Sequence, residues 1–169
     1  MDITVYKDCD KIYALDNFMI VRARLTGEGK TLVFTNGCYD LIHPGHIRLL
    51  QKAKTMGDFL LVGLNGDASI KRLKGEGRPI MPLEARLLLL CSLAMVDGII
   101  VFEEDTPMNI IDILKPDSYV KGIGYSVEEL PEISRVTGYG GRVILMESLS
   151  HFSTTGIINK IRSTSTNLL

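Results

Sequence analysis

The chain has 169 residues, of which 46% are hydrophobic and 23% charged, and its formal net charge is -1. This length suits one compact domain with a single core, and the composition is that of a globular protein, neither disordered nor collagen-like. A charge near zero removes the general electrostatic attraction that drives nonspecific binding to nucleic acid or to anionic membranes. We therefore expect neither nucleic acid nor a membrane as a partner.

Two further features bear on the compartment. The longest nearly apolar run, residues 87–96, is shorter than the roughly 20 residues that span a bilayer, and the N-terminus lacks a signal-peptide pattern. The three cysteines, Cys9, Cys38 and Cys91, are an odd number without CxxC spacing. They predict neither a disulfide framework nor a four-ligand zinc site, so we expect a protein of the reducing cytoplasm.

Along the chain, residues 1–30 predict a lead-in helix within 11–25 and a polar loop, and residues 31–169 predict the main domain. Five apolar, β-branched runs predict strands at 31–35, 59–65, 98–102, 118–121 and 142–146. Segments with helical spacing follow them at 44–56, 82–95, 107–114, 126–137 and 153–163. This alternation predicts an α/β fold with a doubly wound parallel five-stranded sheet, helices on both faces, and ligands bound at the carboxyl ends of the strands.

Two glycine patterns resemble nucleotide-binding motifs without matching them. Gly29-Lys30-Thr31 lacks the first glycine of a P-loop, because Arg24 stands there, and it precedes the first strand. Gly122-Ile123-Gly124 lacks the third glycine of a dinucleotide fingerprint, because Val127 stands there. We therefore disfavour a P-loop nucleotidase and a nicotinamide enzyme.

The segment from Thr35 to His46 joins the first strand to a helix and carries the strongest chemical signal. Pro44 suits the first helical turn, where its missing N–H would have had no partner. His43 and His46 are three residues apart, so both imidazoles can face an anion at the positive end of that helix. We interpret the segment as a phosphate site that stabilises charge developing on phosphorus.

Less chemical roles stay open for several residues. His46 continues a helical stripe with Leu49, Leu50 and Ala53, so it can instead be a packed core residue. Cys38 and Tyr39 are interpreted as packing residues. Asp40 suits loop capping as well as it suits holding substrate or metal.

His-x-Gly-His after an opening strand resembles the signature of the nucleotidyltransferase superfamily that includes the cytidylyltransferases. Further matching segments are 65–67, 73–79, 82–86, 102–106 and 153–155. Over about residues 31–162 the chain resembles the D-glycero-D-manno-heptose 1-phosphate adenylyltransferase branch. The resemblance implies a Rossmann-like sheet and transfer of AMP from ATP to a sugar 1-phosphate, with Mg²⁺ on the triphosphate. The implied products are pyrophosphate and an ADP-sugar, which serves surface-glycan assembly.

The resemblance also implies roles for individual residues. The catalytic candidates, which bind phosphates or neutralise their charge, are His43, His46, Lys74 and Arg78. The candidates for enclosing the nucleotide are Thr35, Asn36, Gly37, Lys121, Gly122, Ser153, Thr154 and Thr155. The candidates for binding the second substrate or organising its site are Asp40, Asp67 and Arg86. Mg²⁺ usually keeps its waters and takes few protein ligands, so we name no protein metal ligand.

Each of these supporting residues has a simpler reading. The cations Lys71, Arg72, Lys74 and Arg78 can belong to a solvated loop around Glu76. Asp67 and Ser153 can each cap the helix that follows it.

Departures from the resembling family bear on the substrate. Relatives commonly carry Lys-Gly-Gly-Asp-Tyr where this chain has Lys121-Gly122-Ile123-Gly124-Tyr125, so an acidic group is missing. Segment 146–152 lacks the arginine usual in the glycerol-phosphate cytidylyltransferase branch, which disfavours CTP. The alternatives are a cytidylyltransferase acting on glycerol 3-phosphate or a similar phospho-alcohol, and a noncatalytic nucleotide-binding module. The oligomeric state stays open, with a homodimer as one option.

Overall fold

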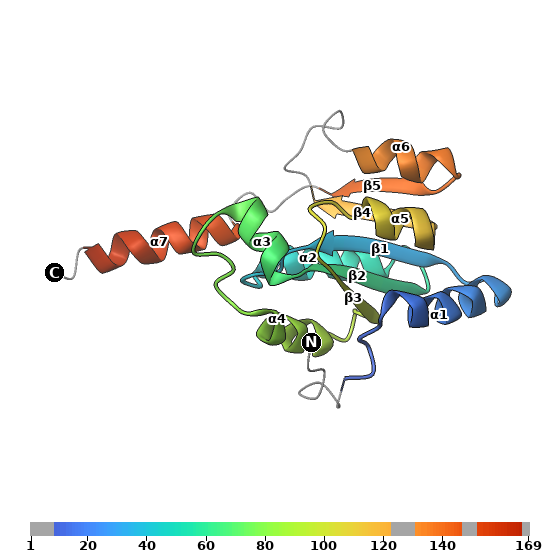
Figure 1. Cartoon of the computed structure of the whole chain (residues 1–169), viewed down its shortest axis with the longest axis horizontal. Helices are drawn as coiled ribbons and strands as arrows, with labels where there is room; N and C mark the ends of the chain where they lie inside the picture. The colour runs from blue at the N-terminus through green and yellow to red at the C-terminus, as the bar shows by residue number, and fades with distance from the viewer. Residues whose placement is uncertain (1–8, 123–130, 147–151, 167–169) are drawn as a thin grey trace.

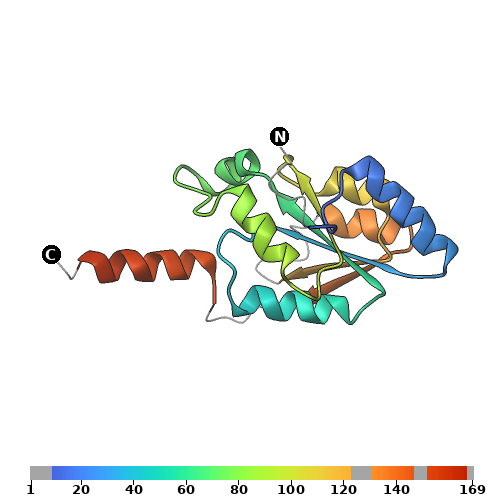
Figure 2. The same ribbon diagram turned by 90° about the horizontal axis from the view of Figure 1, so that it is seen from below.

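The structure is a computed structural model and describes residues 9–122, 131–146 and 152–166. These residues form five strands, β1 (Leu32–Gly37), β2 (Phe59–Asn65), β3 (Gly98–Phe102), β4 (Ser118–Gly122) and β5 (Arg142–Met146). Their helices are α1 (Leu15–Gly27), α2 (Pro44–Lys54), α3 (Asp67–Lys74), α4 (Leu83–Cys91), α5 (Met108–Leu114), α6 (Pro131–Gly138) and α7 (Thr154–Thr166). Figures 1 and 2 show the helices around one central sheet, with α7 leaving the body of the domain.

The sheet is parallel throughout and has the strand order β3-β2-β1-β4-β5. The chain builds outward from β1 to one edge and then returns to add β4 on the other side. The strand order therefore reverses beside β1, and the carboxyl end of β1 is where a doubly wound sheet opens a ligand crevice. The predicted α/β, Rossmann-like fold is confirmed.

Both faces of the sheet are buried because successive strand residues point to opposite sides. On one face Val33 and Leu60 pack with Leu50 of α2 and Leu87 of α4. The other face packs against α1, α5 and α6, through Phe18, Leu25, Leu32, Phe34, Leu61, Ile110, Ile111, Leu114, Tyr119 and Val136. The near-continuous apolar strands thus place helices on both sides and leave the strand ends for polar chemistry.

Helices α3 and α4 differ from what the sequence predicts. Helix α3 contains Lys71, Arg72 and Lys74, for which the sequence left a solvated loop open, because its eight residues are too few and too polar for a clear apolar stripe. Leu88 and Leu89 belong to the longest nearly apolar run but are 62% and 38% exposed, because only one side of α4 faces the sheet. Helix α6 begins at Pro131, and the five residues 126–130 of its predicted start lie outside the described residues.

The N-terminal segment joins the main core. The predicted lead-in helix is α1, whose Phe18 is fully buried. Just before it, Ile12 forms a parallel bridge with Ile99, so this short stretch extends the sheet beyond β3. Among the described residues no helix has the length and apolar character needed to cross a bilayer.

One prediction about the cysteines is wrong, because Cys9 and Cys91 form a disulfide. The bridge between residues 12 and 99 brings the N-terminal segment to the β3 edge. There the side chain of Lys11 donates to the carbonyl oxygens of Cys91 and Leu93 at the end of α4. The pair is 82 residues apart in sequence, so no local spacing reveals it. Cys38 is free, and burial raises the pKa of its thiol.

Candidate active site

A cavity of about 650 Å³ lies at the carboxyl ends of the strands. Its walls come from the end of β1, the start of α2, the segment after α3, the end of β4 and the starts of α6 and α7. The sequence-predicted residues that line it are Asn36, Gly37, Asp40, His43, His46, Lys74, Arg78, Lys121, Gly122, Ser153, Thr154 and Thr155. The cavity lining does not include Thr35, Asp67 or Arg86.

His43 and His46 form a stacked pair at the start of α2. Their ring centroids are 3.8 Å apart and their planes differ by 22°. Pro44 begins the helix and no side chain caps it, so the free backbone N–H groups of its first turn donate to no side chain in the part of the protein that the structure describes. The Nδ1 atoms of both rings are buried without a hydrogen-bond partner among the described residues. The two imidazoles therefore offer polar atoms to a ligand rather than to the protein.

Burial makes these imidazoles hard to protonate. It lowers the pKa of His43, and for His46 burial followed by the neighbouring His43 lowers the pKa to about 4, against a weaker opposing contact with the Leu41 backbone. Both rings are therefore neutral hydrogen-bonding groups near pH 7. A bound phosphate would favour their protonated form, because an opposite charge stabilises an imidazolium.

Tyr39 supports the histidine pair from below. Its ring lies 5.0 Å from that of His46, and its backbone φ of +46° turns the chain sharply after β1. The positive φ after β1 thus falls on Tyr39 and not on Gly37. Gly37 is needed for space instead, since a Cβ there would stand 3.1 Å from Cε2 of the Tyr39 ring.

Asp40 holds the segment that carries Arg78. Its carboxylate is 1% exposed, with Oδ2 accepting from Arg78 Nε at 2.6 Å. Its Oδ1 accepts from the backbone amides of Ile80 and Met81 at 2.7 and 2.9 Å. Both carboxylate oxygens are thus occupied by protein donors, and Arg78 is fixed at the cavity wall.

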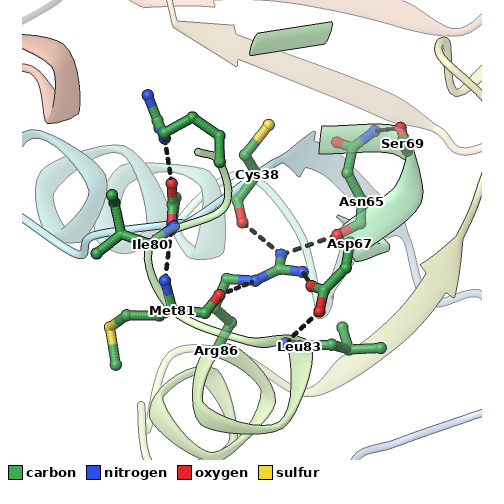
Figure 3. Close-up of polar contacts among 10 residues, drawn as sticks. Cys38, Asn65, Asp67, Ser69, Ile80, Met81, Leu83 and Arg86 are labelled. Carbon is green, nitrogen blue, oxygen red and sulfur yellow. Dashed lines mark hydrogen bonds and ion pairs between the residues drawn. The ribbon is translucent and has the colours of Figure 1, made fainter. Parts of the chain in front are cut away.

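Arg86 joins several chain segments beneath the cavity. Its fully buried guanidinium donates through Nη1 to the carbonyls of Cys38 and Asn65, at 2.7 and 2.8 Å. Through Nη2 it donates to Oδ1 of Asp67 at 2.6 Å, and through Nε to the carbonyl of Met81 at 3.1 Å (Figure 3). These contacts tie the ends of β1 and β2 to α4, so Arg86 positions the backbone of the site.

The four cations after β2 separate into two groups. Lys71 pairs with Glu76 at 3.2 Å, and Arg72 pairs with Asp105 at 2.9 Å and donates to the Glu103 carbonyl, all on the surface. Lys74 and Arg78 line the cavity. Lys71 and Arg72 are therefore solvated surface residues as the simpler reading required, although they lie on helix α3 and not in a loop. The two phosphate candidates are the ones that line the cavity.

The starts of α7 and α6 and the end of β4 complete the wall of the cavity. Ser153 Oγ accepts from the Gly156 amide at 3.0 Å, so it caps α7 as one of its expected roles required. Thr154 donates to the Leu41 carbonyl at 3.4 Å, which brings the start of α7 beside the histidine segment.

Glu132 on α6 also lines this wall and pairs with Lys121 at 2.9 Å. Sequence reasoning missed Glu132, whose local signal is an acidic residue just after the proline that begins a helix. Gly124, where the acidic group of relatives is absent, lies outside the described residues.

Comparison with known proteins agrees with this geometry. A family model described as cytidylyltransferase-like matches residues 34–164. The bifunctional protein HldE of Syntrophotalea carbinolica is 50% identical over 133 residues, which cover 79% of this chain and 27% of the relative. That of Geobacter sulfurreducens is 47% identical over 151 residues, covering 89% and 31%. The chain thus spans less than a third of these curated relatives.

Two solved structures share the fold. The lipopolysaccharide core biosynthesis protein from Thermoplasma volcanium GSS1 is 31% identical with a TM-score of 0.59, covering 71% of this chain and 97% of that one. Pantoate-beta-alanine ligase from Francisella tularensis has the same TM-score at 16% identity over 80% of this chain and 66% of its own, a likeness of fold alone. The chain belongs to the cytidylyltransferase-like family.

Proposed function

We propose that this cytidylyltransferase-like domain transfers AMP from ATP to a sugar 1-phosphate, a heptose 1-phosphate, giving an ADP-sugar and pyrophosphate. The observation that carries the proposal is the stacked His43–His46 pair, whose buried Nδ1 atoms have no partner among the described residues. Lys74 and Arg78 line the same cavity. This grouping of uncommitted imidazoles and cations suits several phosphates in a row.

In the proposed reaction a phosphate oxygen of the sugar 1-phosphate attacks the α-phosphorus of ATP. A bond forms between that oxygen and phosphorus, the bond to the β-phosphate oxygen breaks, and pyrophosphate leaves. The attacking phosphate is already ionised near pH 7, so no protein nucleophile or base is needed. The protein's tasks are to align the two substrates and to stabilise charge on the transferring phosphoryl group.

The side chains divide these tasks. His43 and His46 would bind the phosphates of the reacting centre, while Lys74 and Arg78 would neutralise the triphosphate. Asn36 and Gly37 on one side, with Lys121, Gly122 and residues 153–155 on the other, would enclose the nucleoside.

Buried polar side chains would act through position. Thr35 is 1% exposed under the cavity floor. Asp40, Asp67 and Arg86 make the contacts that fix the surrounding backbone.

ATP would enter as its Mg²⁺ complex. The described residues bring together no group of three or more His, Cys, Asp and Glu side chains fit to hold a metal ion. Of the described carboxylates lining the cavity, Asp40 is occupied by Arg78 and two amides, and Asp105 pairs with Arg72. Glu132 pairs with Lys121 through Oε1 alone. The donor set therefore fits a Mg²⁺ ion held by phosphate oxygens and water, which neutralises the triphosphate as the substrate binds.

The choice of a heptose 1-phosphate rests on the resemblance of residues 31–162 and on the relatives. Half of the aligned residues match the bifunctional protein HldE, and the Thermoplasma volcanium relative is named for lipopolysaccharide core biosynthesis. A role in supplying an activated sugar for a surface glycan follows, in the cytoplasm, where ATP is abundant.

Pyrophosphate release tests the proposal. The protein is incubated with Mg²⁺, with ATP or CTP, and with heptose 1-phosphate, other sugar 1-phosphates or glycerol 3-phosphate. We expect the highest kcat/KM for ATP with heptose 1-phosphate. Preference for CTP and glycerol 3-phosphate would support the cytidylyltransferase alternative, whereas ATP binding without turnover on any acceptor would support a noncatalytic module.

A further inference from the structure

Glu132 has a chemical feature that the proposed reaction leaves unused. The residue is 3% exposed, in the first turn of α6, and it lines the cavity. Its Oε1 is 2.9 Å from Lys121 Nζ at the end of β4. Its Oε2 is buried and has no hydrogen-bond partner among the described residues.

A purely structural ion pair does not account for this arrangement. An ionised carboxylate can accept about four hydrogen bonds, and leaving one of its oxygens dry and unpartnered is costly. Asp40 in the same cavity shows the alternative, since both its oxygens accept from the protein. The free Oε2 of Glu132 therefore fits a donor that arrives with a ligand.

The position of Glu132 indicates which part of the ligand donates. The phosphate-facing side chains His43, His46, Lys74 and Arg78 come from the β1 and β2 side of the sheet. Lys121 lies at the end of β4 and Glu132 in the first turn of α6, so both lie on the other side of β1 in the strand order. In the proposed reaction this side of the cavity encloses the nucleoside, whose nearest strong donors to the phosphates are the ribose hydroxyls.

We propose that Oε2 of Glu132 accepts a hydrogen bond from a ribose hydroxyl of the bound nucleotide, with Lys121 holding the carboxylate in place. Glu132 is thereby a specificity-determining residue that selects ribonucleotides. The proposal rests on the proposed function for the orientation of the nucleotide, and it adds a residue outside the segments that carry the family resemblance.

The experiment compares ATP with 2′-deoxyATP and 3′-deoxyATP, measuring both kcat/KM and the Kd for the nucleotide. A charge-assisted hydrogen bond predicts that the wild-type protein prefers ATP over one of the two deoxynucleotides by about 10- to 100-fold. In Glu132→Gln, the amide oxygen can still accept from Lys121 but the other position becomes a donor. We expect the preference to fall about tenfold, and Glu132→Ala should abolish it.

The ratio of kcat/KM for ATP to kcat/KM for a deoxynucleotide distinguishes a role in recognition from a role in the fold. If Glu132 only supports the fold, its variants lower kcat/KM for ATP and for the deoxynucleotide equally, and the ratio stays at the wild-type level. Arg135→Ala is the matched control, because Arg135 lies on the same helix and forms an exposed pair with Asp112. It should leave the ratio unchanged.

Several outcomes would overturn the assignment. Equal use and binding of all three nucleotides by the wild-type protein would do so even if every Glu132 variant failed to fold. A loss seen with inosine triphosphate, which lacks the exocyclic amine, but with neither deoxynucleotide would move the contact to the base. The Kd can be measured without turnover. If the protein binds ATP more tightly than a deoxynucleotide but turns over neither with any acceptor, the role of Glu132 is supported and the proposed reaction is refuted.

Discussion

Buried polar side chains in two regions of the site differ in their partners. In the cluster around Arg86, beside the cavity, Arg86 donates to three carbonyls and one carboxylate (Figure 3). Both oxygens of the nearby Asp40 also accept from the protein. Around the cavity mouth of α2 and α6, His43, His46 and Glu132 each keep a buried polar atom without a partner among the described residues.

This difference separates framework from ligand-binding groups. A saturated polar side chain fixes the backbone, and removing it leaves buried donors or acceptors without partners. An unpartnered one already bears that cost in the free protein, so its removal affects ligand handling more than folding. Each prediction below tests whether these two sets of side chains differ in this way.

The largest effect is expected for Arg86→Met, which keeps most of the side-chain volume and removes every donor. The carbonyls of Cys38, Asn65 and Met81 would lose their shared partner inside the protein. We expect the free energy of unfolding to fall by about 3 to 5 kcal/mol, as for a broken buried ionic contact. Urea denaturation followed by circular dichroism measures this change.

Arg72→Met is the matched control for Arg86. Arg72 also pairs with an aspartate, but both side chains are about half exposed, at 50% and 53%. Its loss should cost less than about 1 kcal/mol. Equal destabilisation by the two variants would show that the saturated contacts of Arg86 carry no special structural weight.

His46→Ala should have the opposite profile. The variant removes one polar group that faces the reacting phosphates, so we expect kcat to fall by about 10²- to 10³-fold while the protein remains folded. Steady-state kinetics and thermal unfolding, measured on the same preparation, check the two parts. Lys52→Ala, an exposed change on the same helix away from the cavity, is the control. Unchanged turnover in His46→Ala would return His46 to the core stripe.

Acid should destabilise the protein through His46. Its pKa is about 4 in the folded state, mainly because burial disfavours the charged ring, against an ordinary value of 6.5. The unfolded chain then binds the proton more tightly than the folded protein. The free energy of unfolding therefore keeps its full value above pH 6.5 and declines as the pH falls toward 4. Between pH 7 and pH 4.5 this group alone should remove about 2 to 3 kcal/mol.

His46→Gln isolates that contribution, because other titrating groups remain. Denaturant titrations at pH 7, 5.5 and 4.5 should show a shallower decline for the variant than for the wild-type protein. Identical slopes would mean that His46 titrates alike in both states. Saturating Mg²⁺-ATP should also flatten the wild-type decline, since phosphate favours the protonated ring.

The sequence predicts best what is local. The strands are short apolar runs, and the His43–His46 pair follows β1 within one continuous segment, so periodicity and spacing place both. Contacts between distant segments are not visible in this way. The pairing of Cys9 with Cys91 depends on the β3 edge, and the role of Asp40 depends on a segment 38 residues later.

The smallest effect on activity is expected for a change of Lys74, which is compared here with Arg78. Lys74 is exposed at the cavity edge, whereas the Arg78 side chain is 14% exposed and held by Asp40. For Lys74→Ala we expect kcat/KM for ATP to fall about tenfold at physiological salt. Lowering the ionic strength should recover part of the loss, because the remaining cations then act over a longer Debye length.

Arg78→Ala should not be rescued in the same way. It removes a cation and also leaves Oδ2 of the buried Asp40 without its donor, at a cost of about 1 to 3 kcal/mol in stability. Kinetics at two salt concentrations, combined with thermal unfolding, distinguish the variants. Lys74→Ala changes kcat/KM and its salt dependence but not the stability, and Arg78→Ala changes the stability as well. If neither variant altered ATP kinetics or their salt dependence, the segment after α3 would be a solvated loop, and phosphate binding would rest on the histidine wall.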